Sequence, residues 1–114
     1  MSLSMMLRNT RGIPILDVSG SLDIGPSIAA LNDRVTAVLA DSKPCRFVLN
    51  VRELSTMDSA GLGELMLLFR QAAQQNCELV IVGANGSILQ ALRVTRMDGV
   101  LKLADDEEAA IARA

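Results

Sequence analysis

The sequence contains no histidine, no tryptophan and no tyrosine, and its aromatic side chains are Phe47 and Phe69. Without histidine, the chain offers neither an imidazole for acid–base catalysis nor a histidine ligand for a metal ion. Two aromatic rings are also too few for a platform on which nucleic-acid bases stack. The composition therefore argues against histidine-dependent enzymes, histidine metal sites and aromatic binders of single-stranded nucleic acid.

Cysteine is also scarce, because the chain has only Cys45 and Cys77. They lie far apart and form no Cys-x-x-Cys pair, which zinc and thioredoxin-type sites require. The apolar residues 1–7 precede Arg8 and Arg11, the reverse of the charge order in a secretory signal. No apolar run approaches the roughly 20 residues that cross a bilayer. We therefore expect a cytoplasmic protein with buried, reduced thiols, no membrane span, no metal and no other cofactor.

Positive charge is not concentrated anywhere in the sequence. Lysine plus arginine number 11 and aspartate plus glutamate 13, which gives a net charge of −2. A mildly acidic chain without a long basic run is a poor candidate for direct nucleic-acid binding. With 114 residues, of which 50% are hydrophobic and 21% charged, the chain is typical of one folded domain over residues 1–114.

Hydrophobic periodicity predicts alternating strands and helices. Residues 4–7 and 13–18 indicate an N-terminal β-hairpin, in which Pro14 fits only a strand start or an edge. Further strands are expected at 46–51, 77–82 and 100–103, and helices at 27–40, 59–76, 87–96 and 105–112. Residues 52–58 are expected to form a polar loop. The order β-β-α-β-α-β-α-β-α predicts an α/β fold with a single mixed, mostly parallel sheet and about four helices.

Within the second helix, apolar residues at spacings of three and four indicate the core-facing side, which comprises Leu62, Leu65, Met66, Phe69, Ala72 and Ala73. Leu67 lies off this stripe and is expected at the surface. A single exposed leucine is ordinary, so Leu67 is either an incidental surface residue or an apolar anchor for a partner.

The most informative segment is residues 55–63, Ser-Thr-Met-Asp-Ser-Ala-Gly-Leu-Gly. It follows a buried strand, and α/β domains place their sites at the carboxyl ends of parallel strands. Ser59 falls at the expected helix start, where serine is a common N-cap. Gly61 and Gly63 in the first turn each cost about 1 kcal/mol relative to alanine. Close approach of another surface would account for such glycines.

Two catalytic interpretations of this segment fail on the residues present. A dinucleotide or P-loop motif would need a third glycine or a lysine, which the segment lacks. A nucleophile elbow would need glycine where Met57 stands, and the chain has no histidine to activate Ser59. We therefore expect no catalytic residues. A plain N-cap remains the structural alternative for Ser59.

Residues 49–63 resemble the STAS family, whose domain is shared by sulfate transporters and anti-sigma factor antagonists. The earlier Gly20-Ser21-Leu22-Asp23 is similar to a family motif in which Leu-Asp follows a glycine at a strand end. The strand at 79–82 and the acidic residues 105–108 also fit, so that the resemblance covers nearly the whole chain.

The resemblance implies that a free-standing domain of this length is an anti-sigma factor antagonist. In the family, the serine that matches Ser59 is phosphorylated by a partner serine kinase, which is also the anti-sigma factor. The unphosphorylated form binds that partner, and a serine phosphatase resets the switch. The expected partner-binding residues are Asp23, Asp58, Ser59, Ala60, Gly61, Leu62 and Gly63, together with Leu67.

A second interpretation of the same resemblance stays open. The chain would then be a STAS accessory or scaffold subunit of a lipid-transport or stress-signalling assembly, and Ser59 would never be phosphorylated. For either function we expect a monomer or a weak dimer.

Overall fold

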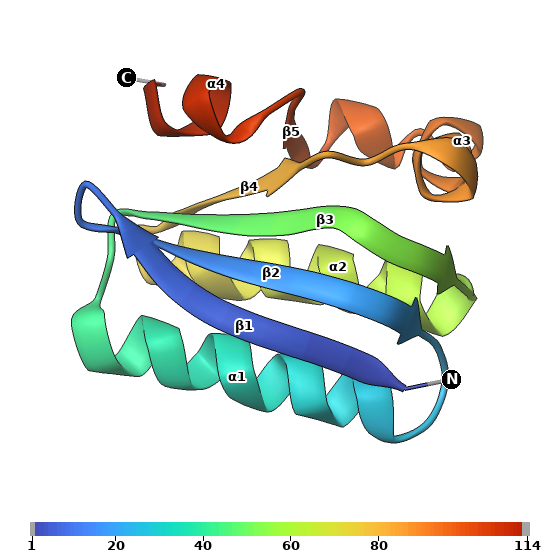
Figure 1. Ribbon diagram of the computed structural model, residues 1–114, viewed down its shortest axis with the longest axis horizontal. Coiled ribbons are helices and arrows are strands. Elements are labelled where there is room, and N and C mark those ends of the chain that lie inside the picture. Colours follow the sequence, from blue (N-terminus) through green and yellow to red (C-terminus); the bar gives the residue numbers. More distant parts are fainter. Residues whose placement is uncertain (1, 113–114) are drawn as a thin grey trace.

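The computed structural model describes residues 2–112, and its strands form one five-stranded sheet in the order β1-β2-β3-β4-β5 (Figure 1). β1 and β2 are antiparallel, whereas the other neighbours are parallel. The strands are β1 (Leu3–Thr10), β2 (Ile13–Leu22), β3 (Arg46–Met57), β4 (Glu78–Val82) and β5 (Lys102–Ala104). This mixed, mostly parallel sheet with an N-terminal hairpin confirms the predicted α/β fold class.

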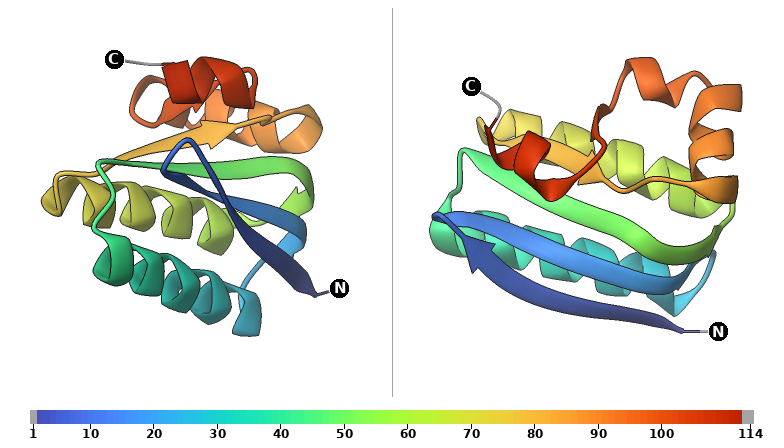
Figure 2. Two further views of the ribbon diagram at one scale, coloured as in Figure 1. Left: turned by 60° about the vertical axis from the view of Figure 1, so that its left-hand side comes forward. Right: turned by 45° about the horizontal axis from the view of Figure 1, so that its top comes forward.

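Helices cover both faces of the sheet, as the two views in Figure 2 show. α1 (Pro26–Ser42) and α2 (Ser59–Gln74) lie on one face, over the larger hydrophobic core. α4 (Glu107–Ala112) covers part of the other face, where Ala110 and Ile111 pack on Ile15 and Val48. α3 (Gly86–Val94) adds Ile88 and Leu92 to the larger core and leads into the short 3-10 helix Met97–Gly99. Between residues 2 and 112, no helix is both long and apolar enough to cross a membrane.

The hairpin between β1 and β2 turns on Arg11 and Gly12, which both have positive φ, at 54° and 81°. Two such residues form the type I′ turn that matches the twist of paired strands. Thr10 and Ile13 therefore form a hydrogen-bonded pair, and the next pair, Asn9 with Pro14, is a non-hydrogen-bonded one. Pro14 thus needs no N–H toward β1, and pairing with β3 begins only at Ile15. Pro14 lies at a strand start, but β2 is not an edge strand.

The prediction of a polar loop at residues 52–58 is wrong, because β3 continues to Met57. The second half of β2 pairs with it, including Gly20 with Leu54 and Leu22 with Met57. Register shifts interrupt this pairing twice, so buried and exposed side chains do not alternate regularly. The irregular pattern resembles that of a loop, which explains why the sequence did not indicate a strand.

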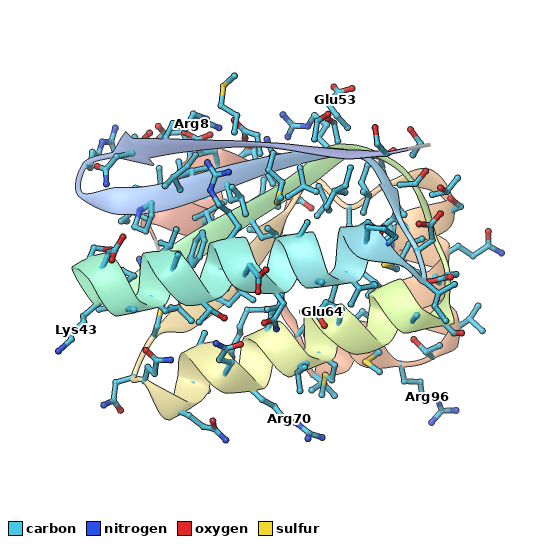
Figure 3. The ribbon with its side chains drawn as sticks, turned by 90° about the horizontal axis from the view of Figure 1, so that it is seen from below. Arg8, Lys43, Glu53, Glu64, Arg70 and Arg96 are labelled. Carbon is cyan, nitrogen blue, oxygen red and sulfur yellow. The ribbon has the colours of Figure 1, made fainter. Side chains whose placement is uncertain are left out.

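The buried side of α2 differs from the predicted stripe in its second half. Leu68 is fully buried and Phe69 only partly, while Ala73 is exposed. α2 packs against α1 as well as against the sheet, so its buried face turns toward α1. Glu64 is consequently 6% exposed, between the two helices (Figure 3), and its Oε2 accepts a hydrogen bond from Asn32 Nδ2 at 3.0 Å.

The two cysteines differ, although both were expected to be buried. Cys77 is 3% exposed, whereas Cys45, in the turn before β3, is exposed. Cys45 follows Pro44 outside the strand, and therefore its side chain is not drawn into the core. Burial raises the pKa of the Cys77 thiol to about 11, so this thiol stays protonated and inert near neutral pH.

We predict that one thiol of the native protein reacts with iodoacetamide near neutral pH and that this thiol is Cys45. Cys77 should react only after unfolding or as the pH approaches 11, because the thiolate is the nucleophile. Mass spectrometry of labelled peptides measures both rates. Cys45→Ser should abolish the fast reaction, and rapid labelling of Cys77 in that variant would contradict the buried placement.

Candidate functional site

The carboxylate of Asp58 joins two loops at the end of β3. It is the N-cap of α2, and its Oδ1 accepts a hydrogen bond from Gly61 N at 2.9 Å. Its Oδ2 accepts another from Ile24 N, also at 2.9 Å, in the loop between β2 and α1. The main-chain N–H of Ile24, and then that of Gly61, hold the pKa of Asp58 below its ordinary value of 3.8. Asp58 is therefore ionised at neutral pH and fixes one loop to the other.

Ser59 is the first helical residue of α2 and not its N-cap. The extended backbone of Asp58, with φ −98° and ψ −174°, takes the capping position, so the structural alternative in which Ser59 is the N-cap is wrong. The side chain of Ser59 is exposed, and within residues 2–112 its hydroxyl makes no hydrogen bond. A hydroxyl in this position can be modified or can contact a partner without breaking an interaction of the fold.

The two glycines of the first turn have different surroundings. A Cβ on Gly61 would collide with the main-chain oxygen of Leu22 and lie 2.8 Å from Cγ of Met57. A Cβ on Gly63 would have no neighbour within 4 Å. The expected close approach therefore exists at Gly61, where the absence of a side chain lets α2 begin directly against the end of β2.

Asp23 lies in the loop that Asp58 fixes. Its N–H donates to Ser27 Oγ at 3.1 Å, and this hydroxyl donates to the Asp23 main-chain oxygen at 2.7 Å. The next residue, Ile24, bonds to Asp58 through its N–H and leaves its side chain 81% exposed. Asp23 and Asp58 are thus brought to one end of the sheet, with an apolar side chain beside them.

A groove of about 410 Å³ opens beside Ser59, between the start of α2 and the outer side of α3. Apolar groups contribute most of its lining, from Met57, Leu62, Ala91 and Val94. Val94 is 75% exposed. Sequence reasoning did not include α3 in the site, although Val94 is a large hydrophobic residue outside the Ile88–Leu92 stripe, the same signal that singled out Leu67.

The predicted partner-binding residues fall into two groups. Asp58, Ser59 and Gly63 are exposed, Asp23 and Ala60 are partly exposed, and Leu67 is 52% exposed, so these six reach the surface. Gly61 and Leu62 are buried, Leu62 with 8% of its surface exposed. These two residues lie beneath the exposed residues and contribute little of the surface area themselves. Within residues 2–112, no group of three or more cysteine, aspartate or glutamate side chains is placed to hold a metal ion.

Comparisons with known proteins agree on one family. The sequence model of the STAS domain matches residues 4–110. The anti-sigma F factor antagonist of Paenibacillus polymyxa is 25% identical over 108 residues, which cover 94% of this chain and 91% of that protein.

Two solved structures share the fold. An anti-sigma factor antagonist from Mycobacterium paratuberculosis superposes with a TM-score of 0.81 at 22% identity, covering 96% of this chain and 92% of that chain. The phosphorylated form of the Bacillus cell-fate determinant SpoIIAA superposes with a TM-score of 0.69 at 18% identity, covering 93% and 96%.

The two glycines provide a matched pair of substitutions. Gly61→Ala should destabilise the protein by about 1–3 kcal/mol, because the methyl group meets the backbone of β2. Gly63→Ala should instead stabilise it by up to about 1 kcal/mol, because open space surrounds the helix there. Urea unfolding measures both changes. A Gly61→Ala variant as stable as the unmodified protein would contradict the close approach at this junction.

Proposed function

Because this chain belongs to the STAS domain family, we propose that it is a cytoplasmic anti-sigma factor antagonist that is switched by phosphorylation of Ser59. In its unphosphorylated form it binds an anti-sigma factor with serine kinase activity, and phosphorylation releases it. A serine phosphatase then restores the binding form. The observation that carries the proposal is an exposed, unbonded Ser59 hydroxyl at the start of α2, with exposed apolar side chains around it.

Three apolar side chains make this end of the molecule suitable for docking. Ile24 is 81%, Val94 75% and Leu67 52% exposed. They come from the β2–α1 loop, from α3 and from α2, and Ser59 lies among these elements. Exposed apolar clusters on a small domain are typical of binding surfaces, and their centres provide most of the affinity. We define Ile24, Ser59, Gly63, Leu67 and Val94 as the docking surface.

Phosphorylation would change this surface more than it changes the fold. A phosphate adds about −1.5 to −2 charges and strong acceptor oxygens. At Ser59 it would lie beside the ionised Asp58, at the rim of the apolar groove. Repulsion and desolvation would then oppose a packed partner. A coupling of about 1–3 kcal/mol, typical of such switches, corresponds to a roughly 5- to 150-fold loss of affinity.

The fold can accommodate the added charge. The Ser59 hydroxyl makes no hydrogen bond in the described residues, so a phosphoryl group on it breaks none. The N-terminus of α2 also favours negative charge, because its first N–H groups and the helix dipole point toward it. We therefore expect the phosphorylated protein to remain folded.

We predict that a serine kinase of the source organism phosphorylates this protein at Ser59. The protein is incubated with ATP and each candidate anti-sigma factor kinase, and phosphopeptides are mapped by mass spectrometry. Ser59→Ala should abolish the label and keep the complex with the kinase. Ser59→Asp should lose that complex while its melting temperature stays close to that of the unmodified protein, because Ser59 is exposed and does not cap α2.

Two outcomes of this experiment would contradict the proposal. Phosphate on other residues, or on none with every candidate kinase, would favour the scaffold function, in which Ser59 is never modified. A large loss of stability in Ser59→Asp would mean that the variant loses the complex because it unfolds, and not because of a charge at the docking surface.

We predict that Val94→Asp weakens binding of the same kinase by about tenfold or more, because it places a charge in the apolar groove. Val100→Asp is the matched control, since Val100 is a 48% exposed valine that does not line the groove. Isothermal titration calorimetry compares the two variants. Equal affinity of both variants would exclude α3 from the docking surface.

A further inference from the structure

The two edges of the sheet are protected very differently. At one edge, β5 has only three residues, and short edge strands resist pairing with other chains. At the other edge, β1 has eight residues and contains neither proline nor lysine. Its pairing with β2 runs through eight consecutive residue pairs without a register shift. The one charged residue of β1 is Arg8, whose guanidinium bonds to Asp17 and Glu107, so β1 has few of the features with which sheet proteins usually block an open edge.

The hairpin turn determines which main-chain groups of β1 point outward. Because Thr10 and Ile13 form a hydrogen-bonded pair, the alternate residues Arg8, Met6 and Ser4 also bond to β2. The hydrogen bond from Ser21 N to Ser2 O continues the same alternation. The N–H and C=O groups of the intervening residues consequently point away from β2; these residues are Leu3, Met5, Leu7 and Asn9. β1 is an edge strand of the sheet (Figure 1).

We propose that this edge is a homodimer interface, in which β1 pairs antiparallel with β1 of a second copy and Met6 lies opposite Met6. The two sheets would then form one continuous sheet across a twofold axis. Such an interface is self-complementary, since the same strand is used on both sides.

The main-chain groups favour this register. The outward-facing residues are symmetric about Met6, so that Leu3 meets Asn9 of the second copy and Met5 meets Leu7. Every outward N–H and C=O of β1 then finds a partner. Shifting the strands by two residues in either direction would leave the groups at one end of each strand unpaired.

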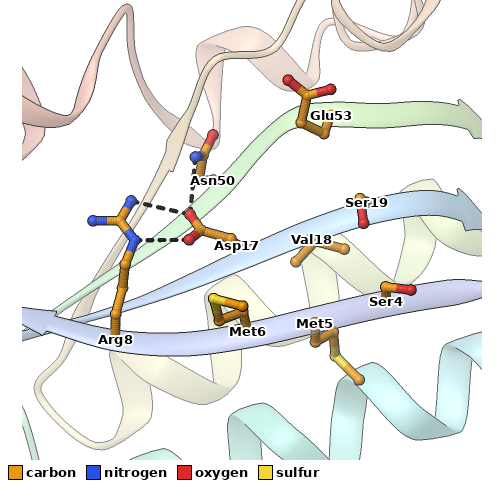
Figure 4. A pocket seen from close by; sticks show the side chains of 9 residues that line it. All are labelled: Ser4, Met5, Met6, Arg8, Asp17, Val18, Ser19, Asn50 and Glu53. Carbon is orange, nitrogen blue, oxygen red and sulfur yellow. Dashed lines mark hydrogen bonds and ion pairs between the residues drawn. The ribbon is translucent and has the colours of Figure 1, made fainter.

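The same register also buries the exposed apolar side chains of β1. Met6 is 66% exposed and points away from α1, whereas Met5 points toward it (Figure 4). Pairing through Met6 would place the two Met6 side chains against each other on the open face. On the α1 side, Leu7, which is 41% exposed, would lie opposite Met5 of the second copy.

Charge is compatible with this pairing. Arg8 is the charged residue of β1, and it would lie opposite Ser4 of the second copy and not opposite a second Arg8. Its guanidinium is held by Asp17, with Nε 2.7 Å from Oδ2 (Figure 4). Glu107 holds the same guanidinium through a second ion pair. The interface therefore brings no pair of like charges together across the two strands.

Helix α1 runs beside the same edge. Ala30 of α1 lies with Leu3 along a shallow groove, and Ala37, two turns later, belongs to the same helix stripe. Arg34 lies between these two alanines on the stripe, so a second copy would meet small and charged side chains along α1. One strand pair with flanking alanines is a small interface, below the ~1,200–2,000 Å² of stable complexes. We therefore expect a dimer that forms only at high protein concentration.

Charge swapping at Met6 tests the register directly. Met6→Lys and Met6→Asp each place like charges opposite each other and should weaken the dimer by about tenfold or more. An equimolar mixture of the two variants should restore association, because lysine then lies opposite aspartate. Sedimentation velocity from low micromolar to near-millimolar concentration measures all three samples and the unmodified protein.

Matched controls separate this result from unfolding and from nonspecific association. Val100→Lys changes an exposed valine outside β1 and should leave the dimer intact. Thermal unfolding should show the Met6 variants folded, since Met6 is largely exposed. A monomer at every concentration, a dimer unaffected by Met6→Lys, or a mixture that fails to associate would each overturn the proposal. None of these outcomes bears on phosphorylation of Ser59.

Discussion

The carboxylate of Asp58 is the interaction on which the geometry of the site depends. It accepts one hydrogen bond from the start of α2 and one from the loop that leads into α1, so that two crossover connections share one anchor. Gly61 permits this arrangement, because any side chain there would meet the Leu22 backbone. Asp58 and Gly61 thereby hold the ends of β2 and β3 against the start of α2. Ser59 lies at this fixed junction.

Of the six exposed large hydrophobic residues in the described chain, all but Val100 belong to the two proposed interaction surfaces. Ile24 and Val94 lie beside the start of α2 and Leu67 lies about two turns along it, whereas Met6 and Leu7 lie on the β1 edge. The first group supports a surface that a charge on Ser59 can switch. The second supports association of identical chains. Because β1 and α1 form the edge and α2 and α3 carry most of the docking surface, the two interactions use different elements.

The sequence predicted the topology because the helices and most strands have regular periodicity, and it located Ser59 because β3 ends at a distinctive motif. The extension of β3 to Met57 was not predicted, because register shifts remove the regular alternation of buried and exposed residues there. The cap was assigned to Ser59 because Asp58 and Ser59 are both good capping residues, and only backbone dihedral angles distinguish them. Val94 was not predicted, because the groove that it lines forms only where α3 packs beside the start of α2, which is distant in the sequence.

The central claim is that a charge on Ser59 acts at the surface while the Asp58 anchor stays intact. Amide hydrogen exchange at Ile24 and Gly61, compared between the unmodified and the phosphorylated protein, tests it most directly, because both N–H groups donate to Asp58. The account predicts that both amides remain equally protected after phosphorylation. Markedly faster exchange at either amide would show that the phosphate displaces the anchor, and the switch would then be a local unfolding.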